Sequence, residues 1–94
     1  MAEDEWIALH YAARKGSVSE VHALLDRGVD VNVKNPYGMT ALHWATENNK
    51  STVVRLLLDK GADINAKTNR GLTAMHYAVY NGYTNIVRFL LNQG

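Results

Sequence analysis

Residues 38–45 read Gly-Met-Thr-Ala-Leu-His-Trp-Ala, and residues 71–78 read Gly-Leu-Thr-Ala-Met-His-Tyr-Ala. A less complete copy, Ile-Ala-Leu-His-Tyr-Ala, occupies residues 7–12, so the phrase returns every 33 residues. The sequence between the copies keeps the same register, because Leu-Leu pairs begin at positions 24, 57 and 90 and glycine follows at 28, 61 and 94. A fixed period of about 20–50 residues is typical of proteins in which each repeat packs on its neighbours. The pattern therefore predicts a short solenoid.

The composition agrees with a small folded protein. Its 94 residues are enough for one domain at most, and 47% hydrophobic with 20% charged residues is unlike a disordered chain. The net charge of +1 provides no general attraction to nucleic acid or membranes, and the lack of cysteine excludes disulfides and thiolate chemistry. The apolar runs are too short to cross a bilayer, and the acidic residues 1–5 argue against a signal or transit peptide. We therefore expect an intracellular, cytoplasmic protein without membrane contact.

Each repeat has the features of two short helices and a turn. Thr40 is a good N-cap residue for a helix of about two turns, which ends near residues 48–49. A second helix begins near Ser51 and carries apolar residues at the i, i+3, i+4 spacing of an amphipathic helix. Gly61 suits the end of that helix, and residues 63–71 are rich in turn formers. The second half of each repeat thus predicts an extended, hairpin-like turn that leads into the next one.

At this level of detail the chain resembles ankyrin repeats. The resemblance rests on the phrases Gly-x-Thr-Ala-Leu-His-Trp-Ala and Leu-Leu-Leu-Asp-Lys-Gly-Ala-Asp-Ile-Asn-Ala-Lys and covers three units, about residues 2–34, 35–67 and 68–94. Ala41 and Ala74 stand where the family usually has proline, which is a mild departure. The resemblance implies an all-α ankyrin-repeat solenoid of three stacked helix-turn-helix units with hairpin-like turns. It also implies a non-catalytic function, the binding of other proteins.

The repeat pattern also predicts which residues are buried. A single repeat cannot bury its apolar face, so we expect equivalent positions of neighbouring units to pack together. The predicted core consists of Leu9, Ala12, Leu24, Leu25, Leu42, Ala45, Val54, Leu57, Leu58, Met75, Ala78, Val87, Leu90 and Leu91.

The two ends of the stack are expected to differ. The first unit has Glu20 where the later units have Val53 and Ile86, a polar replacement that suits a terminal face without a neighbour. The third unit shows no such replacement, so we expect an apolar patch at the C-terminal end. We expect this end to fray, to self-associate or to be covered by further repeats of a longer parent protein. The degenerate first unit and the stop at Gly94 also suit an excised or engineered scaffold without a dedicated partner, and this alternative stays open.

Three histidines recur at the repeat period, at positions 10, 43 and 76. Histidine is a common metal ligand and general base. Packed helices lie about 10 Å apart, however, whereas zinc ligands lie about 2 Å from one ion. The resemblance implies instead that each histidine links its own threonine to the neighbouring turn. The sequence has no phosphate-binding loop or hydrolase motif, and Asp30 and Asp63 are interpreted as turn formers. We therefore expect no metal, no cofactor and no enzymatic activity.

Binding residues are expected at positions that vary from one repeat to the next, while the structural positions stay the same. On the resemblance, the turn tips and the outer edges of the first helices form a concave recognition surface. In this chain, these positions are Trp6, Arg14, Lys15, Lys34, Pro36, Tyr37, Met39, Glu47, Asn48, Lys67, Asn69, Arg70, Leu72, Tyr80 and Asn81. Tyr37 and Tyr80 are the favoured members, because tyrosine is enriched where interfaces carry binding energy. Five basic residues in this set favour a partner of acidic character. Nucleic-acid binding through the same basic residues is the rival prediction, which the low net charge and the lack of a known motif disfavour.

Overall fold

A computed structural model describes the backbone of residues 2–93 and the side chains of residues 6–93. This part of the chain forms six helices: α1 (Ala2–Lys15), α2 (Val18–Asp26), α3 (Ala41–Glu47), α4 (Ser51–Asp59), α5 (Ala74–Asn81) and α6 (Thr84–Gln93). Gly94, which the repeat pattern aligns with two other glycines, lies outside the described residues. None of the helices within residues 2–93 has the length and apolar character needed to cross a membrane.

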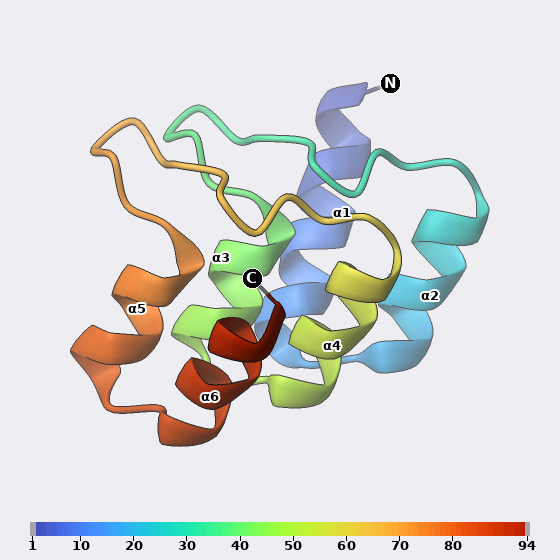
Figure 1. Ribbon diagram of the computed structural model, residues 1–94. Helices are drawn as coiled ribbons and strands as arrows, with labels where there is room; N and C mark the ends of the chain where they lie inside the picture. Colours follow the sequence, from blue (N-terminus) through green and yellow to red (C-terminus); the bar gives the residue numbers. More distant parts are fainter. Residues whose placement is uncertain (1, 94) are drawn as a thin grey trace.

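The helices form three pairs that stack in sequence order (Figure 1). Helices α1, α3 and α5 contact one another in turn and make one row, while α2, α4 and α6 make the second row. The long turns, residues 27–40 and 60–73, pass over the same end of the stack. The predicted solenoid of helix pairs and hairpin-like turns is therefore confirmed.

Local capping explains where the first helix of each later pair begins and ends. The backbone N–H of Thr40 donates to His43 Nδ1 at 2.9 Å, and the N–H of Thr73 donates to His76 Nδ1 at 2.8 Å. Helix α3 ends at Glu47 with Asn48 as its C-cap, and the following residue, Asn49, has a φ of +59°, in the left-handed region that terminates helices. The first pair differs, because α1 begins at Ala2 and runs through the position that threonine occupies in the later repeats. This helix therefore needs no cap there.

Asparagine side chains hold successive turns together. Asn32 Nδ2 donates to the carbonyl of Gly61 at 3.2 Å, and Asn69 Nδ2 donates to the carbonyl of Pro36 at 2.8 Å. The close approach at Asn69 requires glycine at position 38, where φ is +77° and an added Cβ would lie 2.6 Å from Asn69 Oδ1. These contacts fix the spacing of the turn tips and so give the candidate binding surface a defined shape.

The core follows the sequence pattern closely, with one clear error. Most of the predicted residues are buried or half-buried, but Leu91 is 65% exposed, so its assignment to the core was wrong. Leu91 projects from the last helix, and no further helix pair covers it in the described part of the chain. Buried apolar residues that the predicted core omitted are Ala13, Val21, Val29, Ala41, Val53, Ala66, Ala74 and Ile86.

The two ends of the stack differ at the expected position, although the first helix pair also exposes apolar side chains, with Ile7 at 51% and Tyr11 at 58%. Val53 and Ile86 are each 1% exposed against the preceding helix pair, whereas Glu20 is exposed and forms an ion pair with Lys15 at 2.9 Å. At the other end, Val79 is 60% exposed, although the equivalent Thr46 is fully buried. The C-terminal end therefore presents apolar side chains that the equivalent positions of the earlier repeats bury.

Candidate protein-binding surface

The fifteen residues predicted to bind a partner, here called the recognition surface, all retain access to solvent. Those that are exposed are Arg14, Lys15, Lys34, Pro36, Tyr37, Lys67, Asn69, Arg70, Tyr80 and Asn81. Those that are half-buried are Trp6, Met39, Glu47, Asn48 and Leu72. The two favoured tyrosines, Tyr37 and Tyr80, are 73% and 89% exposed. Large aromatic side chains this open are available to a partner.

The three asparagines of the recognition surface also serve the scaffold. Asn48 Nδ2 donates to the carbonyl of Trp44 at 2.8 Å, within the last turn of α3. Asn81 Nδ2 donates to the carbonyl of Tyr77 at 2.9 Å and to Glu47 Oε1 at 3.0 Å, which ties α5 to α3. Because Asn69 joins two turns, all three side chains are already engaged within the protein.

One member of the recognition surface, Lys15, interacts with other residues of the first helix pair. Lys15 pairs with Glu20 and lies with its Nζ 5.0 Å from the centre of the Tyr11 ring. The hydrogen bond from Lys15 lowers the pKa of Glu20 below its ordinary value. Lys15 and Glu20 line a cavity of about 340 Å³ between α1 and α2, at the N-terminal end of the stack. The charge of this lysine is therefore already paired with a carboxylate of the same protein.

Four predicted residues come together at one cavity of about 510 Å³ between α3 and α5. The cavity, here called the α3–α5 cavity, is lined by Glu47, Arg70, Leu72, His76, Tyr77 and Tyr80. His76 and Tyr77 were not among the predicted binding residues, because both belong to the phrase that recurs in every repeat. No signal in the sequence could have selected them, since their access to the surface depends on their place in the stack.

The α3–α5 cavity is lined by one cation, Arg70, and one carboxylate, Glu47, and further cations lie in the long turns. The described side chains form two ion pairs, Lys15–Glu20 and His22–Asp26, and neither includes a cation of the long turns. Lys34 Nζ donates instead to the carbonyl of Lys67 at 3.3 Å. Burial and the Glu47 carboxylate raise the pKa of Tyr77. Among the described side chains, the cavity therefore combines aromatic surface with one cation and one carboxylate that form no ion pair.

The periodic histidines act as links between helices and turns. His43 is buried, and its Nε2 donates to the carbonyls of Ala66 and Leu72 at 3.1 and 3.0 Å. His10 makes one such link, to the carbonyl of Val33 at 3.0 Å, and its Nδ1 has no partner within the described residues. Burial lowers the pKa of both histidines, which favours the neutral ring. Residues 6–93 hold no cluster of three or more side chains that suits a metal ion.

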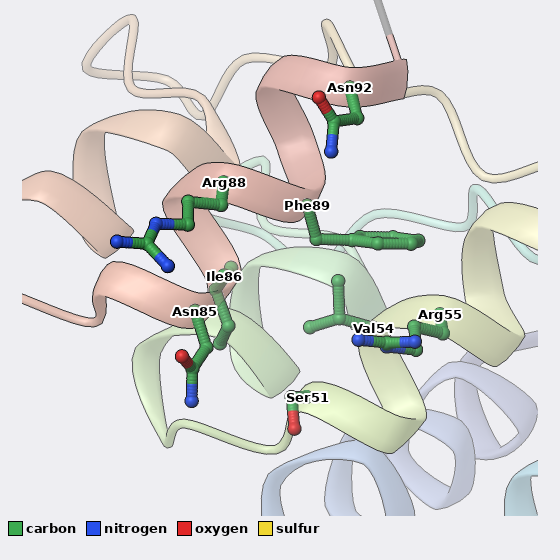
Figure 2. A pocket seen from close by; sticks show the side chains of 8 residues that line it. All are labelled: Ser51, Val54, Arg55, Asn85, Ile86, Arg88, Phe89 and Asn92. Carbon is green, nitrogen blue, oxygen red and sulfur yellow. The ribbon is translucent and has the colours of Figure 1, made fainter.

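A second hollow lies on the outer face, between α4 and α6 (Figure 2). It has a volume of about 290 Å³, and its lining includes Val54 and Ile86, which belong to the core. Phe89 extends from α6 above Arg55 of α4, whose guanidinium lies 4.9 Å from the ring centre, a cation–π contact. Figure 2 shows Arg88 pointing away from this pair. The hollow is the seam between two packed helices, and it contains no residue of the recognition surface.

Comparisons with known proteins agree with the repeat pattern. Residues 1–68 match a family model described as ankyrin repeats in three copies, and residues 46–91 match one described as ankyrin repeats in many copies. A search of curated proteins found no match to this chain.

Proposed function

Because the chain belongs to the ankyrin repeat family, whose members generally bind other proteins and are typically non-catalytic, we propose that it is a protein-binding module acting through its recognition surface. In this proposal, the three units, about residues 2–34, 35–67 and 68–94, act as one domain. The observation that carries the proposal is the α3–α5 cavity, because four residues chosen for their variation between repeats line a single exposed hollow. Variable positions gathered on a fixed scaffold are suited to selecting one partner among many.

The proposed partner has acidic character. Lys34, Lys67 and Arg70 belong to the two long turns, are exposed and form no ion pair with the described side chains. Glu47 is the only acidic member of the recognition surface, and it accepts a hydrogen bond from Asn81. Complementary charge raises the rate of association and disfavours wrong partners.

Removal of the two favoured tyrosines of the recognition surface tests the proposed function. Captured partner should fall by about tenfold or more for the Tyr37→Ala/Tyr80→Ala variant, because buried aromatic anchors each carry about 1–4 kcal/mol at interfaces. The measurement is capture from cell extract, followed by affinity measurement with the purified partner. Tyr11→Ala is the matched control, since Tyr11 is also exposed but lies outside the recognition surface. Equal loss in the control and the double variant would contradict the proposal.

We also propose that the C-terminal end allows self-association. The exposed Val79 and Leu91 face the side on which earlier repeats receive their next neighbour, and exposed apolar patches favour association. Head-to-tail stacking is disfavoured, because it would bury the Lys15–Glu20 ion pair against an apolar surface. The expected arrangement therefore joins the C-terminal ends of two copies.

Sedimentation across a concentration series tests this self-association. The protein should shift from monomer to dimer as concentration rises, and Val79→Ser/Leu91→Gln should remain monomeric because it removes the apolar contact. Glu20→Gln is the control at the opposite end and should behave as the parent chain does. A strict monomer at high concentration, with α6 as well protected from hydrogen exchange as α4, would show that the end is adequately covered by itself.

A further inference from the structure

The α3–α5 cavity combines three kinds of side chain in one place. Its lining provides apolar or aromatic surface from Leu72, Tyr77 and Tyr80, a cation from Arg70, and polar groups from His76 and Glu47. Each kind restricts the chemistry of the ligand that the cavity can accept. Together they define a more specific partner than a general acidic protein.

Arg70 contributes a cation that forms no ion pair with the described side chains. Its position in the turn is fixed, because its backbone N–H donates to Thr68 Oγ1 at 3.2 Å. Neither of the ion pairs among the described side chains includes Arg70, and the carboxylate that shares the cavity, Glu47, accepts a hydrogen bond from Asn81. A guanidinium group matches the geometry of a carboxylate and binds it with two parallel hydrogen bonds. The cavity is therefore suited to an acidic side chain at this position.

His76 contributes a hydrogen-bond donor whose preferred ligand is shown by its equivalent in the preceding repeat. In both repeats a backbone N–H donates to the histidine Nδ1, which places the proton of the neutral ring on Nε2. The Nε2–H of His43 donates to two backbone carbonyls, those of Ala66 and Leu72. The Nε2–H of His76 has no acceptor among the side chains and backbone that the structure describes. His76 lines the cavity, so its Nε2–H is the group there that can donate to a peptide carbonyl.

The aromatic side of the cavity favours a large apolar group. Tyr80 is the most open of the exposed large hydrophobic residues, while Leu72 and Tyr77 are half-buried and held by the scaffold. The ring of Tyr77 packs edge-on against His43, with ring centres 5.7 Å apart. A half-buried ring packed on the scaffold beside an exposed ring is suited to contacting one aliphatic or aromatic side chain.

We infer, on the premise of the proposed function, that the α3–α5 cavity binds an extended peptide segment in which an acidic residue adjoins a large apolar one. The carboxylate pairs with Arg70, a backbone carbonyl of the segment accepts the Nε2–H of His76, and the apolar side chain packs between Leu72 and Tyr80. All three contacts come from the lining of one hollow of about 510 Å³, which suits a short segment of a partner protein.

A peptide library displayed against the full chain tests this inference. Enriched peptides should contain aspartate or glutamate beside leucine, methionine or an aromatic residue. For a selected peptide, replacement of the acid by its amide should weaken binding to the parent chain by about tenfold, the effect of losing a charge-assisted hydrogen bond. The same replacement in the peptide should have little effect on its binding to the Arg70→Gln variant. Each of the two changes removes the same interaction, so the second has nothing left to remove. Lys60→Gln, a change of an exposed cation outside the cavity, should leave the tenfold difference intact.

The outcomes separate this inference from the proposed function. One outcome would overturn the inference and leave the proposed function standing. In it, Tyr80→Ala weakens peptide binding, but the acid-to-amide change weakens binding equally for the parent chain and for Arg70→Gln. Enrichment of peptides without an acidic residue, or of no peptide, would also overturn it, and capture by the Tyr37→Ala/Tyr80→Ala variant would still decide the proposed function. Circular dichroism of each variant establishes that it is folded before binding is compared.

Discussion

Leu57→Ala is expected to lower the free energy of unfolding by about 2–5 kcal/mol, the usual range for a leucine truncated in a packed core. Leu57 is fully buried in α4, which contacts both α2 and α6, so the cavity would lie at the centre of the stack. A folded chain of this size has a total stability of only about 5–14 kcal/mol. The substitution therefore removes a large share of the stability, and the variant could be largely unfolded at physiological temperature.

Urea denaturation followed by circular dichroism measures this effect. Leu91→Ala is the matched control, since it removes the same atoms from a largely exposed leucine and should change stability by less than about 0.5 kcal/mol. A loss of less than about 1 kcal/mol for Leu57→Ala would contradict the assignment of this position to the core. Such a result would also remove the basis for a continuous core through the middle repeat.

His43→Ala is expected to lower the free energy of unfolding by about 1–3 kcal/mol, because it leaves buried polar groups without partners. The substitution removes the acceptor of the Thr40 N–H and the donor to the carbonyls of Ala66 and Leu72. It therefore removes the hydrogen bonds that link α3 to the following turn. His22→Ala is the control, because His22 is exposed and its ring bonds only to Asp26. Equal stability of the parent and His43→Ala, or tight zinc binding that His43→Ala abolishes, would contradict the structural role of this histidine.

The same histidine should make stability depend on pH. Burial lowers the pKa of His43 below the ordinary value of 6.5, so the unfolded chain binds this proton more readily than the folded one does. The stabilising contribution of His43 is therefore complete above pH 6.5 and is lost as the pH falls towards the lowered pKa. His43→Ala should show a weaker loss of stability on acidification than the parent chain, measured by urea denaturation at several pH values. Some dependence should remain, because burial also lowers the pKa of His10.

The candidate site shows which of its parts could be predicted from the sequence. Glu47, Arg70, Leu72 and Tyr80 were predicted because they differ from their equivalents in the other repeats, and the structure gathers them at one cavity. His76 was interpreted as scaffold, since His43 has the same sequence surroundings. His43 is buried under the following turn, whereas His76 is exposed. The cause of this difference in burial is the neighbouring repeat and not the repeat that contains each histidine.

The sequence by itself determined the period, the helix pairs, the turns and most of the core, because these depend on contacts and backbone preferences that each repeat carries within it. The tertiary structure decided which of several equivalent residues is covered. Thr46 is fully buried and Val79 is 60% exposed at the same position of successive repeats, although valine is the more apolar of the two. Burial in this fold is created between repeats, so it depends on whether a neighbour is packed on that side and only partly on the residue itself.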